Sequence, residues 1–418
     1  MKNFILILVF LNIAVCSLHG QSKIDWKSDI EFLKSELPAK HIHLFFSVSK
    51  KEFTSKLDNI ISDVDKLTDL EVAMGLQRII AGMGDSHTGI NTRGLLDSTN
   101  KLPLRLYWFS DGLYVLQTTL ENEELLGKKI ISINRFKIKV IVDSLSTLIT
   151  ADNSAIVKKD IPFLISFAQL LQYFRFGWND SFSIEVESPV GTRLVKEIKA
   201  AKLNRDNLVS FKPDSVSFFR ENQKLLFTDK YSENDSIYYV QYNKCWGREM
   251  EEKYGDKEKA AGLPSFAEYR KSIFETINNR PVNKLVFDMR LNSGGSSPQG
   301  TDLITDLATQ DKINKKGKLF VVIGRATFSS AIINAMDFKS KTNAVFVGEE
   351  TGGKPSHFGE VKIFNLPSSG LKVNYSTKYF KRTEEDLKTL KPDITIEESF
   401  SDFKKGIDPV YEWIVNYK

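Results

Sequence analysis

Residues 284–295 read KLVFDMRLNSGG, a short apolar run that ends in a polar turn with two glycines. Two more apolar runs follow it, LFVVI at residues 319–323 and AVFV at residues 344–347. Residues 298–309 and 329–340, which lie between the runs, have helical patterns. Strands that alternate with helices predict a mostly parallel sheet with crossover helices. Ligands of such sheets bind at the carboxyl ends of the strands, so we expect the chemistry in the turns after these three runs.

The chain before this α/β part divides into further regions. Residues 24–83 are predicted to be helical because apolar side chains recur every three or four residues, and Thr68 offers an N-cap for the last helix. Residues 101–200 have strand-like patterns, including a hairpin signal at Asp111-Gly112 and a helical insertion near residues 151–176. We therefore predict four parts: a signal peptide at 1–20, a helical N-terminal segment at 21–100, a β-rich module at 101–205 and an α/β core at 206–418.

The composition is that of a globular protein, because 41% of the 418 residues are hydrophobic and 27% are charged. The 58 basic and 53 acidic residues give a net charge of +5 and are scattered along the chain. We find no zinc finger, no RNA-binding aromatic signature and no basic helix, so we expect no nucleic-acid partner. The sequence also lacks a phosphate-binding loop, a dinucleotide fingerprint and an HExxH motif, so no cofactor is expected.

The first residues resemble an export signal. A short basic start is followed by an apolar run from Phe4 to Cys16, which is too short to span a bilayer comfortably. Cleavage after Gly20 would fit, although Leu18 is large for the minus-three position. An N-terminal anchor and a lipoprotein signal at Cys16 are weaker alternatives. We therefore expect an exported protein, periplasmic or extracellular, with no stable membrane insertion after cleavage.

Cysteine and histidine are too few for a metal cluster. Signal removal would leave only Cys245, which excludes an internal disulfide, and its apolar surroundings predict a buried side chain rather than a nucleophile. His41 and His43 could share one face of a strand, but no third ligand is evident, so we expect no metal site.

The three turns carry residue types that suit nucleophilic catalysis. Gly294 and Gly295 can turn backbone N–H groups outward to bind a developing oxyanion, although the same glycines suit a plain turn. Ser329 and Ser330 open a predicted helix, where a serine is either an N-cap or an exposed nucleophile. Lys354 lies in a glycine-rich loop, where a dry pocket would let it act as a base.

A fourth motif, GDSHTGI at residues 84–90, follows the helical segment. A histidine near a serine nucleophile is the commonest general base, which makes His87 a second candidate. A single histidine is more often structural.

Together, these motifs resemble the C-terminal-processing (tail-specific) serine peptidases and their tricorn-like relatives. Residues 288–295 are similar to that family's Asp-x-Arg-x-Asn-x-Gly-Gly element, and residues 327–331 to its nucleophile segment. Lys354 follows Ser329 by 25 positions, the spacing of nucleophile and base lysine in tail-specific members, which selects Ser329 over Ser330. The resemblance implies a crotonase-like or Clp-protease-like catalytic core and a PDZ-like module over residues 101–205.

The resemblance leaves the general base open. Tail-specific enzymes imply a dyad of Ser329 and Lys354, whereas tricorn-like enzymes imply His87, supported by Ser86 and by an acidic residue on the far side of the core. The candidates for that acid are Glu384, Glu385 and Asp386. The oxyanion would be held by the N–H of Gly294 or Gly295 and that of Ser330.

The predicted function is hydrolysis of peptide bonds in proteins or peptides through an acyl-enzyme on Ser329. Two alternatives belong to other classes. The first is a catalytically inactive scaffold of the same fold that binds peptides or other ligands. The second is an acyl-CoA-handling crotonase relative, which the pairing of a serine with a lysine disfavours because that chemistry needs no serine nucleophile. Oligomeric state and cleavage preference are not encoded in these motifs.

Overall fold

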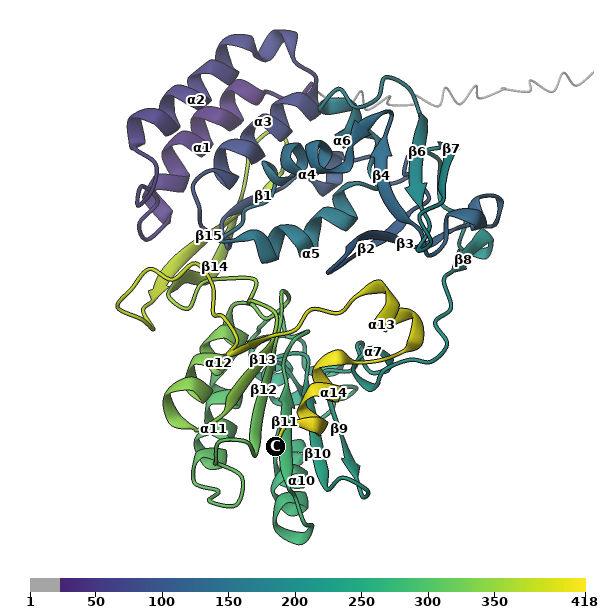
Figure 1. Cartoon of the computed structure of the whole chain (residues 1–418). Coiled ribbons are helices and arrows are strands. Elements are labelled where there is room, and N and C mark those ends of the chain that lie inside the picture. Colours follow the sequence, from purple (N-terminus) through teal and green to yellow (C-terminus); the bar gives the residue numbers. More distant parts are fainter. Residues whose placement is uncertain (1–22) are drawn as a thin grey trace, which may run out of the picture.

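The computed structural model describes residues 23–418, so the predicted signal peptide lies outside the described residues. Figure 1 shows two groups of elements, with the N-terminal helices and the β-rich part above and the α/β core below. Within the described part of the chain, no helix is both long and apolar enough to cross a bilayer. The predicted α/β class with a helical N-terminal segment is confirmed.

The core is built on a six-stranded sheet in the order β16-β13-β12-β11-β10-β9. Its strands are parallel except β9, which pairs antiparallel with β10. They run β9 Phe227–Ser232, β10 Ile237–Tyr242, β11 Lys284–Asp288, β12 Leu319–Ile323, β13 Val345–Gly348 and β16 Ile394–Thr395. The three apolar runs of the sequence are thus β11, β12 and β13, side by side as predicted.

Helices cover both faces of this sheet, which explains why β11, β12 and β13 are almost continuously apolar. On one face, Phe287, Val321 and Phe346 share a core cluster with helices α10, α11 and α12. On the other face, Val286 and Val322 pack with α14. The core helices are α7 Phe218–Glu221, α8 Arg248–Tyr254, α9 Lys257–Ala260, α10 Phe266–Asn279, α11 Ser297–Ala308, α12 Ser330–Lys341, α13 Phe400–Lys405 and α14 Pro409–Asn416.

The N-terminal segment forms the predicted helices α1 Trp26–Lys40, α2 Lys50–Asp63 and α3 Asp69–Ala81. Thr68 caps α3 as expected, in a capping box with Glu71. A small sheet that the sequence patterns did not predict joins this segment to the core. Its order is β1-β15-β14, with β1 Gly89–Asn91, β14 His357–Asn365 and β15 Lys372–Phe380. This sheet matters for the site because of two histidines. β1 begins two residues after His87, and His357 is the first residue of β14.

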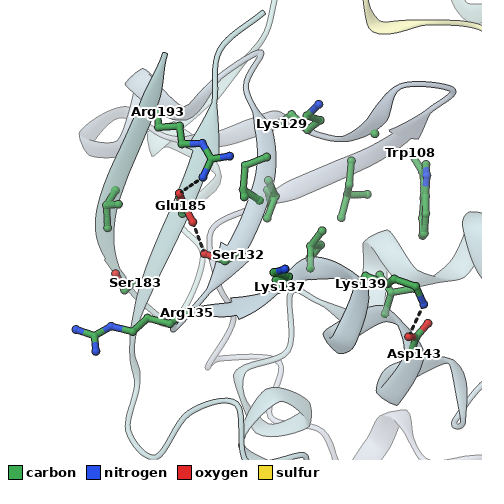
Figure 2. Close-up of a pocket in the computed structure, with 17 residues that line it drawn as sticks. Trp108, Lys129, Ser132, Arg135, Lys137, Lys139, Asp143, Ser183, Glu185 and Arg193 are labelled. Atoms are coloured by element: carbon green, nitrogen blue, oxygen red, sulfur yellow. Dashed lines mark hydrogen bonds and ion pairs between the residues drawn. The ribbon is translucent and has the colours of Figure 1, made fainter. Parts of the chain in front are cut away.

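The β-rich part has a sheet in the order β2-β3-β4-β6-β7, to which β5 and β8 pair. The hairpin predicted at Asp111-Gly112 joins β2 to β3, and the predicted helical insertion is α5 with α6. The elements are β2 Arg105–Phe109, β3 Gly112–Thr119, β4 Lys129–Ile133, β5 Phe136–Lys137, α4 Ile138–Ser146, α5 Ser154–Leu164, α6 Ala168–Tyr173, β6 Ser181–Glu187, β7 Arg193–Lys199 and β8 Leu208–Ser210. A cavity of about 1260 Å³ opens on this part, with Trp108 and Arg193 at opposite ends (Figure 2).

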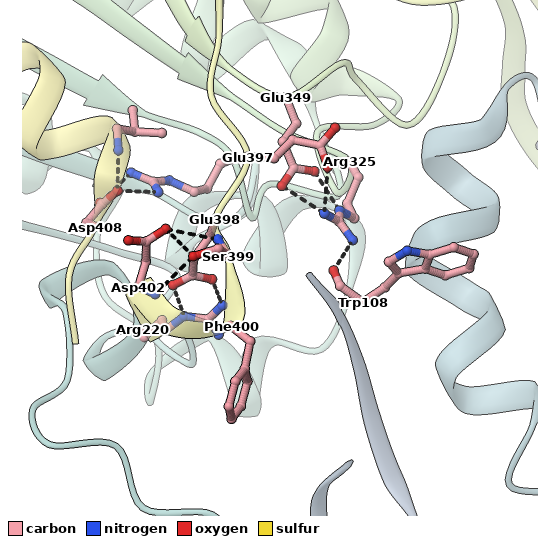
Figure 3. Close-up of polar contacts among 12 residues, drawn as sticks. Trp108, Arg220, Arg325, Glu349, Glu397, Glu398, Ser399, Phe400, Asp402 and Asp408 are labelled. Atoms are coloured by element: carbon pink, nitrogen blue, oxygen red, sulfur yellow. Dashed lines mark hydrogen bonds and ion pairs between the residues drawn. The ribbon is translucent and has the colours of Figure 1, made fainter. Parts of the chain in front are cut away.

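Buried ion pairs and the C-terminal chain tie the β-rich part to the core (Figure 3). Arg325 donates to both carboxylate oxygens of Glu349 at 2.6 and 2.8 Å, and also to the carbonyl of Trp108 in β2 at 2.6 Å. Arg220 pairs with Glu398 nearby. The ring of Phe400 in α13 stacks on Tyr114 of β3, with ring centroids 4.2 Å apart. Since Arg325 is four residues before Ser329, this junction lies close to the predicted nucleophile.

Candidate active site

The turn between β12 and α12 holds Ser329 in a backbone conformation that few residues adopt. Its φ is 56° and its ψ is −126°, directly before the first residue of α12. Two contacts with the chain after β11 fix the turn: the Thr327 hydroxyl donates to the Met289 carbonyl, and Phe328 N donates to the Asn292 carbonyl. Positive φ at a non-glycine residue costs free energy and often marks a functional turn.

The two adjacent serines differ in their partners. The Ser330 hydroxyl donates to the Gly295 carbonyl at 2.7 Å, which fixes its direction. No hydrogen bond among residues 23–418 involves the hydroxyl of Ser329. Its side chain is also partly exposed, whereas Ser330 is buried. Of the pair, only Ser329 is therefore free to attack a substrate.

The glycine turn after β11 lies directly against the serines. Gly294 has a φ of 92°, and a Cβ atom there would lie 2.9 Å from Ser329 Cβ and 3.0 Å from Ser330 N. Gly294 N donates to the side chain of Asn292, so it is already engaged. The backbone N–H groups of Gly295 and Ser330 make no hydrogen bond in the described part of the chain. These two groups are therefore the available oxyanion donors. Gly294 instead allows the glycine turn to pack closely against the two serines.

His87 is brought to the nucleophile turn from the other end of the sequence. Its ring stacks on Phe328 at a centroid distance of 4.5 Å, and on His357 at 5.5 Å. Both ring nitrogens are buried, and neither has a hydrogen-bond partner among the described residues. Burial, assisted by the neighbouring His357, lowers the pKa of His87 to about 4. At neutral pH the imidazole is uncharged and can accept a proton.

Lys354 lies in a cluster of carboxylates beside a cavity of about 470 Å³. Its Nζ is 3.4 Å from Asp386, and its backbone N is 3.4 Å from Asp152. Asp152 also accepts a hydrogen bond of 2.6 Å from Ser86, the residue before His87. Burial raises the pKa of Asp152. The lysine is thus held by contacts with two acidic residues.

The other predicted support residues lie apart from the serine. Glu384 is exposed and pairs with Lys381 at 2.6 Å, and Glu385 is also exposed. Asp386 contacts the side chains of Lys354 and Lys388. Within residues 23–418, no hydrogen bond or ion pair joins any of these three acids to His87 or Ser329.

Cys245 is fully buried as predicted, and burial raises the pKa of its thiol to about 12, so it is not a nucleophile at neutral pH. The Nε2 atom of His41 forms a hydrogen bond with Asp85, so His41 does not form a shared site with His43. The described residues contain no group of three or more His, Cys, Asp or Glu side chains placed to hold a metal ion.

Three residues near the site were given no role from the sequence, namely Asp85, Asp152 and His357. His357 donates from Nδ1 to the Lys354 carbonyl at 3.0 Å and stacks on His87, linking the two candidate bases. Asp85 accepts the backbone N–H of His87 at 2.9 Å. The Asp-x-His spacing could have indicated the contact between Asp85 and the His87 backbone, because an aspartate side chain commonly accepts a hydrogen bond from the backbone N–H two residues later in the chain.

Comparison with known proteins adds to this geometry. Residues 304–396 match the model of peptidase family S41. That segment contains α12, the Ser329 turn and the loop that carries Lys354. The match confirms the resemblance to the C-terminal-processing and tricorn-like serine peptidases, and it supports a serine peptidase. A comparison with curated protein sequences gives no match.

Solved structures share the fold of the whole chain. Mature CPAF is 12% identical, with a TM-score of 0.62, and the alignment covers 92% of this chain and 94% of CPAF. Mature CPAF in complex with lactacystin is also 12% identical, with a TM-score of 0.61 and coverage of 92% and 96%. At this identity the likeness shows that the N-terminal helices, the β-rich part and the core occur together in a known fold.

Proposed function

We propose that the protein is an exported serine peptidase that hydrolyses peptide bonds through an acyl-enzyme on Ser329, with His87 as the general base. One observation carries the proposal: within the described residues, the Ser329 hydroxyl makes no hydrogen bond, it lies on a turn with positive φ next to the unengaged N–H groups of Gly295 and Ser330, and the buried ring of His87 stacks on the adjacent Phe328. The S41 match over this segment supports the same chemistry.

In the proposed reaction, Ser329 Oγ attacks the substrate carbonyl carbon while its proton passes to a ring nitrogen of His87. The carbonyl oxygen becomes an oxyanion, which the N–H groups of Gly295 and Ser330 bind; one such donor typically lowers the barrier by about 3 kcal/mol. His87 then gives the proton to the leaving amine as the C–N bond breaks. Water attacks the acyl-enzyme by the same route and regenerates Ser329.

The surroundings of the two candidate bases favour His87. A base must be unprotonated, and burial keeps His87 neutral above about pH 4. Lys354 instead pairs with the Asp386 carboxylate at 3.4 Å, and no hydrogen bond joins its Nζ to Ser329 within the described residues. We assign Lys354 to holding its loop against Asp152 and Asp386.

Proteins or peptides are the proposed substrates. The 1260 Å³ cavity of the β-rich part combines apolar side chains such as Ile130 and Val142 with basic ones such as Lys129 and Arg193. We propose that the predicted PDZ-like module holds a polypeptide while the core cuts it, and this combination of side chains supports that role.

The inactive scaffold is the second candidate, because no hydrogen bond joins Ser329 to His87 among the described residues. Digestion of casein and of a peptide library by the purified mature chain separates the two. We expect cleavage that Ser329→Ala abolishes, by about 10⁴-fold or more, and that Ser330→Ala retains. Binding of peptides without cleavage, equal in the wild type and Ser329→Ala, would establish the scaffold instead.

A further inference from the structure

A buried carboxylate lies directly before His87. Asp85 is 2% exposed and accepts four hydrogen bonds. The donors are His41 Nε2 at 3.0 Å, Ser376 Oγ at 2.7 Å, Thr88 Oγ1 at 2.5 Å and His87 N at 2.9 Å. They come from the end of α1, from β15 and from the His87 turn itself. Such a concentration of donors is what stabilises an ionised carboxylate away from water.

The hydrogen bonds of His41 show that it does not neutralise this charge. The backbone N–H of His43 donates to His41 Nδ1 at 3.0 Å, so Nδ1 is an acceptor and carries no proton. The single proton of the ring is then on Nε2, where it is donated to Asp85. His41 is therefore the neutral tautomer, and the pair keeps one negative charge.

No lysine or arginine among the described residues forms an ion pair with Asp85. His357 carries its proton on Nδ1, bonded to the Lys354 carbonyl, and burial lowers its pKa. Lys354, in the same cavity, lies next to Asp152 and Asp386. Burial by itself would raise the pKa of Asp85, but the hydrogen bonds outweigh burial and lower it to about 2.

A buried charge without a partner is costly, so its retention calls for a function. His87 is a group that can become positive: Asp85 holds its backbone, and its ring has no hydrogen-bond partner among the described residues. The charge of Asp85 acts to raise the pKa of His87, against the larger effect of burial. Phe328 covers one face of that ring and neutral His357 the other. The negative charge of Asp85 is thus poised to stabilise an imidazolium at His87.

We propose that Asp85 is the positioning residue of the His87 base, and that its charge stabilises protonated His87 during acyl transfer, in place of the exposed acids at 384–386. The inference rests on the proposed function. Asp85 neither gains nor loses a proton: the Ser329 proton moves to His87 and then to the leaving amine. This differs from a triad in which a carboxylate bonds the imidazole ring itself.

The test combines histidine NMR with kinetics. In the ¹⁵N-histidine-labelled wild type at neutral pH, His41 should be the neutral Nε2–H tautomer. In Asp85→Asn, the pKa of His87 should fall by about one unit, and the acid limb of kcat/KM should move with it. The kcat should fall by about tenfold with little change in KM, because one pKa unit of lost imidazolium stabilisation corresponds to that change in rate.

Asp29→Asn is the matched control. Asp29 is also a fully buried carboxylate of the N-terminal segment, but it accepts from the backbone of Ser368 and Ser369. Its variant should lose stability and leave the His87 pKa unchanged. A merely structural role for Asp85 would give the same pattern as Asp29→Asn.

Two results would overturn the proposal: a doubly protonated His41 in the wild type at neutral pH, or a folded Asp85→Asn protein with unaltered His87 pKa and kcat. Should Asp85→Asn not fold, the wild-type His41 spectrum decides by itself. Absence of Ser329-dependent hydrolysis in the wild type would defeat the proposed function, while the NMR titrations would still show whether the charge of Asp85 acts on His87.

Discussion

His87 and Lys354 have opposite surroundings, and the difference predicts which substitution stops catalysis. His87→Gln should lower kcat/KM by about 10²- to 10⁴-fold, the usual contribution of a general base. Lys354→Met should stay within about tenfold of the wild type, since its ammonium pairs with Asp386 rather than with the serine. Steady-state kinetics on one peptide substrate would measure both.

The pH dependence gives an independent check on the base. A base with a pKa of about 4 is active when unprotonated, so kcat/KM should be level near neutral pH and fall as the pH drops through about 4. A neutral-lysine base would instead make activity rise into the alkaline range. An alkaline limb that disappears in Lys354→Met would contradict our assignment.

At the scale of single residues, the sequence was enough to find residues that belong to a local motif. A strand, a turn and a helix follow one another within a few positions around Gly294, Gly295 and Ser329, so these residues were found. The surroundings of His87 were not predictable, since Ser376 reaches Asp85 across 291 positions of sequence. His357 stacks on His87 only because β14 pairs with β15 and so places its first residue there.

At the scale of elements, the glycine turn after β11 should control the position of the nucleophile. In Gly294→Ala, the new Cβ would press on Ser329 Cβ and Ser330 N. We expect kcat to fall by about 10²-fold, the effect of a displacement of roughly 1 Å. Strain at a positive φ should cost about 1–2 kcal/mol of unfolding free energy.

Gly370→Ala is the control for that strain. Gly370 has a φ of 70°, and nothing lies within 4 Å of its would-be Cβ, so this variant should lose stability and keep full activity. Equal loss of activity in the two variants would mean that Gly294 does not hold the serine turn.

The elements themselves were predictable where one physical cause dominates. β11, β12 and β13 are apolar throughout because helices cover both faces of their sheet, and their runs were found nearly to the residue. The β14–β15 hairpin was missed because β14 is exposed over most of its length and lacks the continuous apolar run that marks β11, β12 and β13.

At the scale of the whole molecule, the junction at Arg325 joins the core to the β-rich part. Arg325→Met would leave Glu349 and the Trp108 carbonyl without their donor. Because both charged side chains are largely buried, we expect a loss of about 2–4 kcal/mol in unfolding free energy by chemical denaturation. Adding Glu349→Gln should recover a large part of it. A loss below about 0.5 kcal/mol would mean that the contacts of Arg325 do not hold the core and the β-rich part together.

Contacts of this kind could not be read from the sequence. The number of regions and their class were predicted from local patterns, but Arg325 and Trp108 are 217 positions apart. Their pairing depends on how whole sheets pack. The likeness to CPAF over 92% of the chain shows that the fold recurs at 12% identity.

The central claim is that Ser329 is an activated nucleophile. Intact-mass measurement after treatment of the purified mature chain with a fluorophosphonate tests it most directly, with Ser329→Ala and Ser330→Ala alongside. Our account predicts one adduct on the wild type and on Ser330→Ala, and none on Ser329→Ala. Labelling that persists in Ser329→Ala, or a wild type that stays unlabelled at several pH values while a control serine peptidase reacts fully, would contradict it.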